Sequence, residues 1–421
     1  MRTSGSAAFS VATASLVALS ALTLWAVHLC GWTLYSGDAE AHLMIARTIT
    51  DSQTPGYGQF GTVWLPLPHI LMLPLACIDS LWRNGLAGAI PAALCFVLAG
   101  AFLFAAVERL FASTAAAAAA MAAFAVNPNL LYLQSIPMNE TIFFAALAGL
   151  LYFGVRFAED RSWKAAVGAG VCAWAATLTR YDGWFLLPVA AIYFLWMGRR
   201  GRIPAALLFC VIAASGPLLW MGYDWWMTGD ALDFYRGPYS ALAIQGRATY
   251  PGLHDWHTAF VYYSNAVKLC AGPLLVTIGF AGAVACLLRR KFWPVVLCAI
   301  PPLVYVASVH SGGLPIFLPT LWPHSYYNAR YGTSAIPLFA IGIAALVALA
   351  PRKAQPAAAL VLVAFTAGWW AFHARPSQWV VWEESRVNSE GRRAWTRTAS
   401  DFLSLHYHSG DGLLTSSYPL T

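Results

Sequence analysis

The chain has 421 residues, of which 59% are hydrophobic and only 10% are Asp, Glu, Lys or Arg. Soluble proteins carry roughly 25% charged residues, so this composition excludes an ordinary water-soluble domain and predicts an integral membrane protein. Neither the net charge of +7 nor the eight cysteines indicates nucleic-acid binding or a disulfide framework. The basic residues lie between apolar stretches, and the cysteines lie mostly within them, at irregular spacing.

A helix needs about 20 apolar residues to cross the hydrocarbon core of a bilayer. About eleven segments approach this length, and they lie at residues 8–30, 86–107, 114–133, 141–157, 165–179, 183–197, 203–222, 269–288, 293–309, 332–350 and 356–373. A secretory signal peptide is the alternative for the first segment. Its apolar stretch is long and ends without a small-x-small cleavage site, so we expect a retained anchor. The sequence thus predicts an all-α, polytopic membrane fold.

Residues 62–82 are apolar enough to span, but they contain three prolines, His69 and Asp79. The distribution of charge decides how this segment is placed. If it does not cross, the loops on the N-terminal side hold 13 of the 25 Lys and Arg residues and only three of the 18 Asp and Glu residues. Basic loops face the cytoplasm. We therefore predict a cytoplasmic N-terminus, an odd number of crossings, and residues 62–82 lying in or dipping into the outer interface.

This topology puts three sizeable segments on the non-cytoplasmic face. They are residues 31–84, which are expected to form juxtamembrane helices, the larger loop 223–267, and a tail over residues 375–421. The aromatic residues of the larger loop are typical of a membrane-interface belt. We divide the chain into a transmembrane domain, residues 1–374, and a short external tail.

The first external segment carries an acidic motif directly after the first span. Asp38 and His42 lie one turn apart on a helix that is expected to run to about residue 50, so they share a face, while Glu40 points elsewhere. The structural alternative is that Asp38 is the helix N-cap and Glu40 a first-turn acid. Capping does not exclude catalysis, because it fixes the direction of the carboxylate.

Two further turns on the same face carry charged residues. Glu140 follows a proline-bounded turn and starts a span, and a helix-start acid at the interface is its structural alternative. Arg180, Tyr181 and Asp182 form the apex between two spans that reach only about 22 Å, so the apex is expected to be slightly recessed. Charged residues at that depth must be paired or face water, which makes them functional candidates. A structural pair of Arg180 with Asp182 or Asp38 is the alternative.

Tyr327, Arg330 and Tyr331 lead into the tenth predicted span. Arginine at a membrane edge suits a phosphate, and simple snorkelling to lipid headgroups is the alternative. The His254-Asp255-x-His257 spacing in the larger loop is too loose for a metal site, and we assign no metal ligands. A divalent cation remains an alternative source of positive charge for a phosphate.

Together these motifs resemble those of the membrane-embedded C-type glycosyltransferases, in the branch of the protein O-mannosyltransferases and lipid A aminoarabinose transferases. The resemblance rests on the early acidic motif, a basic-ended second span, a Pro-x-x-x-Tyr turn followed by an acid, a Leu-Thr-Arg-Tyr-Asp-Gly-Trp turn and a late Tyr-Asn-x-Arg-Tyr-Gly. It covers roughly residues 1–200 and 320–350.

The resemblance implies transfer of one sugar from a polyprenyl-phosphate donor to a hydroxyl of a protein, lipid or glycan. The reaction is expected on the non-cytoplasmic face of the inner or plasma membrane, among membrane lipids and without nucleic acid. Asp38 takes the position of the acid that acts on the acceptor. Relatives have two adjacent acids there, whereas this chain has Asp38 and Glu40 separated by Ala39, so either is a candidate for the base.

The remaining roles are also carried over from the resemblance. Glu140 matches a second acid, Arg330 a late basic residue near the donor phosphate, and Arg180 a position where relatives often have Lys. The neighbouring side chains expected to contact substrate are His42, Tyr181, Asp182, Tyr327 and Tyr331.

The chemistry independently accounts for this set of residues. Displacing a sugar from a lipid phosphate needs a base for the acceptor hydroxyl and positive charge, from Arg or a divalent cation, for the leaving phosphate. It parallels inverting glycoside hydrolysis with a hydroxyl in place of water, and we expect the lipid tail in a groove among the spans. Three other classes stay open: another enzyme of lipid-linked substrates (a polymer ligase or lipid phosphotransferase), a secondary transporter, and a non-catalytic membrane subunit. The nearly charge-free spans argue against a transporter.

Overall fold

The computed structural model describes residues 3–199, 201–246 and 248–412. In these ranges the chain consists of helices and connecting loops without a β-strand, and the one extended pairing is an isolated bridge between Phe317 and Tyr327. The predicted all-α class is confirmed.

Among the described residues, seven helical segments are long and apolar enough to cross a membrane, which confirms a polytopic membrane protein. Two helices that meet at 108°, α14 and α15, count as an eighth span if they are taken as one broken helix. The total of eleven and the cytoplasmic N-terminus stay predictions. The segments are Ala7–Leu29 in α1 (Thr3–Leu29), α5 (Leu86–Phe111), α8 (Glu140–Asp160), α11 (Ile203–Thr228), α16 (Phe292–Ser311), Ala329–Val347 and α18 (Gln355–Phe372), with α14 (Trp256–Ala271) and α15 (Pro273–Leu288) as the bent pair.

Two of the predicted spans are helices shorter than the hydrocarbon core is thick. α9 (Trp163–Thr177) has 15 residues and α10 (Leu186–Gly198) has 13, which corresponds to about 22 and 20 Å. They are joined by a tight turn that contains the 3₁₀ helix η2 (Tyr181–Phe185). This turn is the apex that the sequence marked as a functional candidate.

The predicted span over residues 114–133 is wrong as a single helix. It is divided between α6 (Thr114–Ala125) and α7 (Pro128–Leu133). The side chain of Asn127 accepts hydrogen bonds from the N–H groups of Asn129 and Leu130, so it caps a new helix at this point. Pro128 occupies the first position of α7, where its missing N–H carries no penalty.

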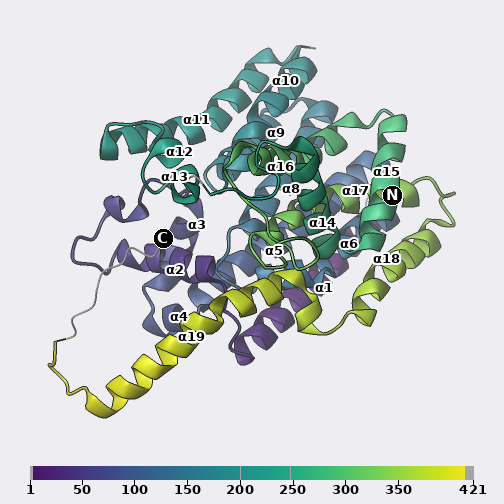
Figure 1. Cartoon of the computed structure of the whole chain (residues 1–421). Coiled ribbons are helices and arrows are strands. Elements are labelled where there is room, and N and C mark those ends of the chain that lie inside the picture. Colours follow the sequence, from purple (N-terminus) through teal and green to yellow (C-terminus); the bar gives the residue numbers. More distant parts are fainter. Residues whose placement is uncertain (1–2, 200, 247, 413–421) are drawn as a thin grey trace.

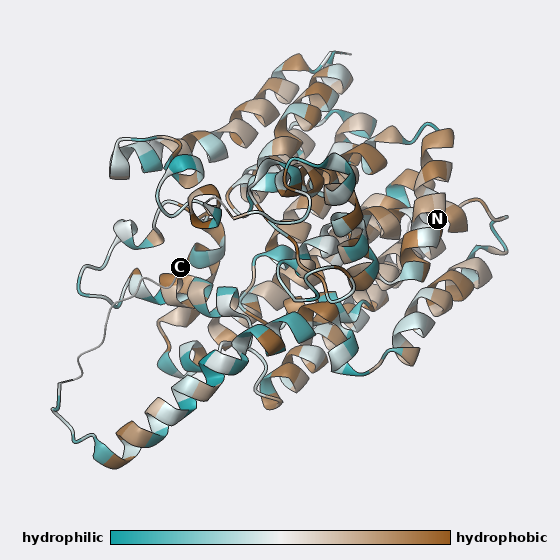
Figure 2. Ribbon diagram, in the orientation of Figure 1, coloured by the Kyte–Doolittle hydropathy of each residue, from teal (hydrophilic) through white to brown (hydrophobic). Residues whose placement is uncertain are grey.

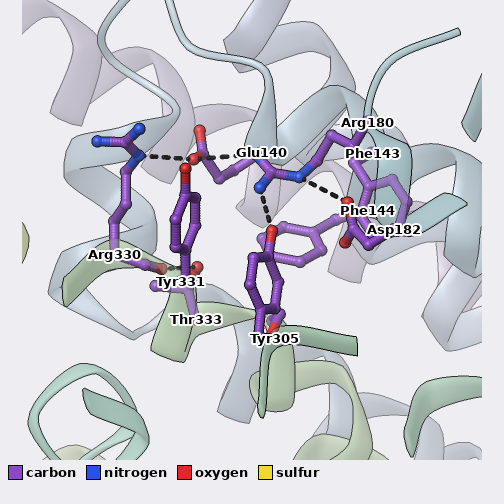
Figure 3. A pocket seen from close by; sticks show the side chains of 10 residues that line it. Glu140, Phe143, Phe144, Arg180, Asp182, Tyr305, Arg330, Tyr331 and Thr333 are labelled. Atoms are coloured by element: carbon purple, nitrogen blue, oxygen red, sulfur yellow. Dashed lines mark hydrogen bonds and ion pairs between the residues drawn. The ribbon is translucent and has the colours of Figure 1, made fainter. Parts of the chain in front are cut away.

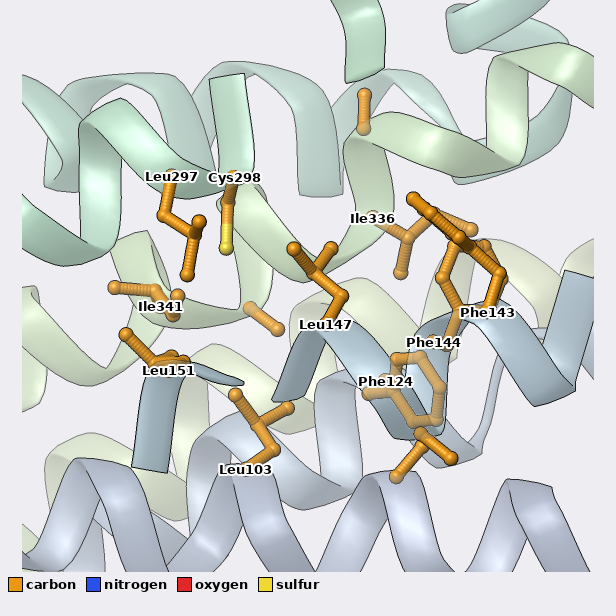
Figure 4. Packing of buried hydrophobic residues seen from close by; sticks show 14 of the residues in the cluster. Leu103, Phe124, Phe143, Phe144, Leu147, Leu151, Leu297, Cys298, Ile336 and Ile341 are labelled. Carbon is orange, nitrogen blue, oxygen red and sulfur yellow. The ribbon is translucent and has the colours of Figure 1, made fainter. Parts of the chain in front are cut away.

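The tenth predicted span begins as a 3₁₀ helix, η3 (Ala329–Ala335), and continues as α17 (Ile336–Val347). α17 packs so closely against α15 that a Cβ added to Gly282 would lie 1.9 Å from the carbonyl oxygen of Gly342. Contact through small residues is typical of membrane helix bundles. Figure 4 shows the apolar core beside these helices, where Leu147 of α8 meets Cys298 of α16.

Residues 31–84, which are predicted to be external, form four short elements: α2 (Gly37–Thr48), η1 (Tyr57–Phe60), α3 (Leu67–Ala76) and α4 (Asp79–Arg83). α3 has ten residues, about 15 Å, so it is too short to cross alone, and the placement of residues 62–82 in the outer interface stays a prediction. Figure 1 shows α2, α3 and α4 together at the left of the view. The N-cap of α2 is Ser36, so the alternative in which Asp38 is the N-cap is wrong.

The larger loop, which is predicted to be external, holds α12 (Asp233–Arg236) and α13 (Ala241–Gln245), and the C-terminal segment forms η4 (Pro376–Gln378) and α19 (Val380–His406). α19, yellow in Figure 1, runs from the middle of the view past α4. Figure 2 shows that it is more hydrophilic than the helices of the bundle. The domain division at residue 374 stays a prediction, and residues 413–421 of the predicted tail lie outside the described ranges.

The predicted topology can be tested by labelling. Arg202 lies before α11 and Tyr239 between α12 and α13, both are exposed, and the topology puts them on opposite sides. In intact cells a membrane-impermeant maleimide is expected to label Tyr239→Cys but not Arg202→Cys, in a background where the exposed Cys30 and Cys77 are replaced by Ser. Both should react after permeabilisation. Labelling of Arg202→Cys in intact cells would show that the topology is wrong.

Candidate functional site

Glu140 lies at the centre of a charged cluster at the start of α8 and is only 3% exposed. Its Oε1 accepts hydrogen bonds of 3.2 Å from Nη1 of Arg180 and from Nε of Arg330 (Figure 3). An acid in the first turn is also favoured by the free N–H groups and the dipole of the helix. One carboxylate therefore joins two arginines that come from distant parts of the chain.

Arg180 connects the turn before η2 to α8 and α16. Its guanidinium donates to Oδ1 of Asp182 at 3.1 Å, to Oδ1 of Asn139 at 2.6 Å and to the hydroxyl of Tyr305. Its Cζ lies 5.7 and 5.4 Å from the ring centres of Tyr305 and Tyr331, within the range of cation–π contacts. Burial raises the pKa of Asp182, and the charge of Arg180 opposes that shift. These contacts hold the guanidinium in one orientation.

Arg330 lies in the first turn of η3 and is the second cation of the cluster. Its Nη2 forms an ion pair with Oδ2 of Asp38, and its Nη1 lies 3.8 Å from Oε1 of Glu384 in α19. The side chain of Arg330 is 14% exposed, whereas that of Asp38 is 42% exposed. Of the carboxylates that pair with Arg330, Asp38 is thus the most accessible from outside the cluster.

A narrow cavity with room for about one water molecule lies between the two arginines and the aromatic residues around them. Oε2 of Glu140 and Oδ2 of Asp182 are buried and have no hydrogen-bond partner among the described residues. Such unpaired oxygens are costly and are often found at functional sites. The lining residues, most of them labelled in Figure 3, are Glu140, Phe143, Phe144, Arg180, Asp182, Tyr305, Arg330, Tyr331, Thr333 and Ser334.

This arrangement combines two chemical capabilities. Two fixed guanidinium groups can bind an anion such as a phosphate through several hydrogen bonds. Asp38, half-exposed beside Arg330, can accept a proton from a hydroxyl group. The predicted Asp38, Glu140, Arg180, Asp182, Arg330 and Tyr331 are therefore brought together by the fold.

Five of the predicted site residues do not line the pocket; Asp38 reaches the cluster only through Arg330, and the other four are Glu40, His42, Tyr181 and Tyr327. Glu40 forms an ion pair with Arg392 of α19. Tyr181 donates its hydroxyl to the carbonyl oxygen of Val63 at 2.8 Å, and Tyr327 lies in the loop before η3 and is 40% exposed. Contacts of these residues with substrate stay predictions.

His42 is buried on α2 and contacts a second histidine from α3. Its Nδ1 lies 2.9 Å from Nε2 of His69, and its ring centre lies 4.2 Å from that of Trp64. Burial, assisted by the charges of Arg330 and Arg180, lowers the pKa of His42 to about 3. Burial also lowers the pKa of His69. The pair is therefore neutral at physiological pH and does not add charge to the site.

The sequence interpretation missed two residues that contact the arginines. Tyr305 lies inside an apolar predicted span, where a single tyrosine carries no signal that distinguishes it from an interface residue. Glu384 lies in the tail, beside Glu383 and after an apolar Val-Val-Trp. Two adjacent acids in a segment predicted to be external were the only signal for Glu384.

The carboxylates of the cluster pair with arginine. Within the described ranges, no three His, Cys, Asp or Glu side chains gather closely enough to bind a metal ion. Asp38, Glu140 and Glu384 converge on Arg330 instead. In this arrangement the positive charge available to an anion comes from the two arginines.

Residues 76–220, about a third of the chain, match the family model of the dolichyl-phosphate-mannose-protein mannosyltransferases. The matched segment includes Glu140, Arg180 and Asp182, whereas Asp38 and Arg330 lie outside it. No curated protein matches the chain. The family consists of glycosyltransferases, so the resemblance and the enzyme class inferred from the motifs are confirmed. The chain is accordingly a multi-pass membrane glycosyltransferase that resembles the protein O-mannosyltransferases.

Proposed function

We propose that the protein transfers a single sugar from a polyprenyl-phosphate donor to a hydroxyl group of an acceptor, on the non-cytoplasmic face of the inner or plasma membrane. The observation that carries the proposal is the pocket in which Arg180 and Arg330, both nearly buried, meet Glu140 while Asp38 stays accessible. Two arginines and a reachable carboxylate are the groups that an inverting displacement on a sugar phosphate requires.

The two arginines are suited to the phosphate of the donor. Each is held by aromatic and carboxylate neighbours, so the cationic groups need little reorganisation when negative charge develops on the leaving oxygen. Glu140 accepts hydrogen bonds from both and fixes their spacing. We therefore assign Glu140 to holding the arginines rather than to accepting a proton.

Asp38 is the base in the proposed reaction. The acceptor oxygen attacks the anomeric carbon, and the bond from that carbon to the phosphate oxygen breaks. Polyprenyl phosphate leaves with the bonding electron pair, and the hydroxyl proton passes to Asp38. The ion pair with Arg330 keeps the base beside the phosphate, while its 42% exposure leaves room for an acceptor.

Apolar side chains beside the site support a lipid-linked donor. A second small cavity, lined by apolar residues, lies within the bundle and shares Phe144 with the first. Figure 4 shows Phe144 beside Phe124 and Leu147, which also line this second pocket. The tail of a polyprenyl phosphate needs such surfaces, because its isoprene units gain free energy by leaving water.

A turnover assay tests the proposal. The purified protein in lipid nanodiscs is given radiolabelled polyprenyl-phosphate mannose or polyprenyl-phosphate aminoarabinose together with a cell-envelope extract. Polyprenyl phosphate should be released as the label moves to the extract, and a nucleotide sugar should not replace the donor. Turnover of the nucleotide sugar alone, or no turnover of any lipid-linked sugar, would contradict the proposal.

Replacing Arg330 by Lys is expected to raise the KM for the donor about tenfold or more. Lysine keeps the charge but loses the planar fork that contacts Asp38, Glu140 and Glu384 at the same time. One charge-assisted hydrogen bond contributes about 1.5–3 kcal/mol, and about 1.4 kcal/mol corresponds to tenfold. The control is Arg397→Lys on the exposed part of α19. An unchanged donor KM in the Arg330 variant would remove this residue from the phosphate site.

A further inference from the structure

The C-terminal helix α19 inserts a buried carboxylate beside Arg330. Glu384, in the second turn of α19, is 6% exposed. Its Oε1 accepts a hydrogen bond of 3.0 Å from the N–H of Asn328, and its Oε2 accepts one of 2.8 Å from the N–H of Ala329. Oε1 also lies 3.8 Å from Nη1 of Arg330. Three consecutive residues at the start of η3 therefore face one carboxylate.

These contacts hold a backbone turn that costs free energy. Asn328 has a φ of 57°, in the left-handed region that asparagine adopts more readily than most other residues but that still needs local contacts to hold it. An ionised carboxylate that accepts two backbone hydrogen bonds binds more strongly than a neutral acceptor. Because Arg330 lies two residues after Asn328, this turn sets the position and the direction of the Arg330 side chain.

The same helix is attached to the other parts of the site. Arg392 donates to the carbonyl oxygens of Leu34 and Tyr35 at 3.0 Å and forms an ion pair with Glu40, so α19 is bound to the segment that carries Asp38. The ring of Trp382 lies 5.0 Å from that of Trp32. α19 thus connects the element of the base with the element of Arg330.

We infer that Glu384 is a positioning residue for Arg330, and that α19, through Glu384 and Arg392, fixes the distance between the donor-phosphate site and Asp38. This inference rests on the proposed function for the role of Arg330. It assigns the C-terminal segment to the active site, although that segment lies outside the part of the chain that matches the mannosyltransferase family.

Two substitutions at Glu384 separate charge from size. In Glu384→Gln only one of the two backbone N–H groups keeps an acceptor, because the amide nitrogen of Gln faces the other. We expect a donor KM raised about tenfold with a smaller change in kcat. Glu384→Asp keeps the charge on a side chain that is one methylene shorter, so its donor KM should lie between those of the unmodified protein and of Glu384→Gln. The matched control is Glu383→Gln, which removes a neighbouring carboxylate that pairs with Arg386 instead.

The pH profile provides a readout that a purely structural role would not change. Burial raises the pKa of Glu384 to about 7, against the opposing charge of Arg330. The carboxyl is therefore ionised above about pH 7 and takes up a proton below it, so the donor KM should rise as the pH falls through 7. The other groups facing it are Asp38, Tyr327 and the thiol of Cys270. If the rise of the donor KM at low pH disappears in Glu384→Gln, the rise is due to Glu384. If the rise persists in this variant, the inference is contradicted.

A substrate-free measurement keeps the inference distinct from the proposed function. Phenylglyoxal modifies accessible guanidinium groups, and modification of Arg330 can be followed by peptide mass spectrometry. Glu384→Gln should speed this modification several-fold relative to Glu383→Gln, because Arg330 loses one of its three carboxylate partners. Equal rates in the two variants would overturn the positioning role. Failure of the unmodified protein to use any lipid-linked sugar would instead contradict the proposed function, and the phenylglyoxal result would still decide the role of Glu384.

Discussion

Replacing Asp38 by Asn is expected to lower the rate of sugar transfer by about a hundredfold or more, because a positioned general base contributes roughly 10²–10⁴-fold to such a reaction. Asparagine preserves the size of the side chain and its place in α2, so the protein should remain folded. It cannot accept the proton of the acceptor hydroxyl. The measurement is kcat with the lipid-linked sugar donor that supports turnover of the unmodified protein.

The control for this prediction is Glu40→Gln. The sequence left both acids as candidates for the base, but only Asp38 contacts Arg330, while Glu40 pairs with Arg392. Because Arg392 keeps its hydrogen bonds to Leu34 and Tyr35, Glu40→Gln should lower kcat far less than Asp38→Asn does. If Glu40→Gln abolished transfer and Asp38→Asn did not, the base would have to be reassigned to Glu40.

Much of the charged cluster could be predicted from the order and sidedness of the motifs. Asp38, Glu140, Arg180 and Arg330 each lie where an apolar segment ends, and the distribution of basic residues among the loops put all four ends on one face. In a packed helix bundle, segments that end at the same level of the membrane are neighbours, so the residues at their ends can meet. The pairing of Arg330 with both Asp38 and Glu140 required the structure, because sidedness does not say which neighbours meet.

Glu384 could not be predicted in the same way. It lies in a polar amphipathic helix that does not span, so no apolar boundary fixes its depth, and the sequence does not show where α19 packs. Tyr305 was missed for the opposite reason, as it lies within a span that hydropathy identifies only as a whole. Direct contact with an arginine is a tertiary property in both cases.

The helix breaks illustrate a second limit of sequence interpretation. Hydropathy averages over a window of about 19 residues, and the Asn127-Pro128 break contributes too little polarity to interrupt the apolar run from residue 114 to 133. The break is decided locally, by a side-chain cap and a missing N–H. It has a consequence for the site, because α7 and the turn after it lead directly to Glu140.

Glu140→Gln is expected to destabilise the protein by about 3 kcal/mol, since removing one partner of a buried ion pair leaves an uncompensated charge. The value lies at the low end of the usual range because each arginine keeps another carboxylate, Asp182 for Arg180 and Asp38 for Arg330. Thermal unfolding of the detergent-solubilised protein, followed by tryptophan fluorescence, measures the loss.

The matched control lies on the same helix. Glu159→Gln removes a carboxylate from the exposed ion pair with Arg109, whose side chains are 44% and 41% exposed, and exposed pairs contribute less than about 1 kcal/mol. The Glu140 variant should therefore unfold at a clearly lower temperature than the Glu159 variant. Equal midpoints would mean that Glu140 does not neutralise the two arginines in the folded protein, and the cluster would then have to be held by Asp38 and Asp182 alone. A lower midpoint for Glu140→Gln would measure the contribution of Glu140 to stability. Loss of activity at temperatures where this variant is still folded would show its separate role in holding the arginines.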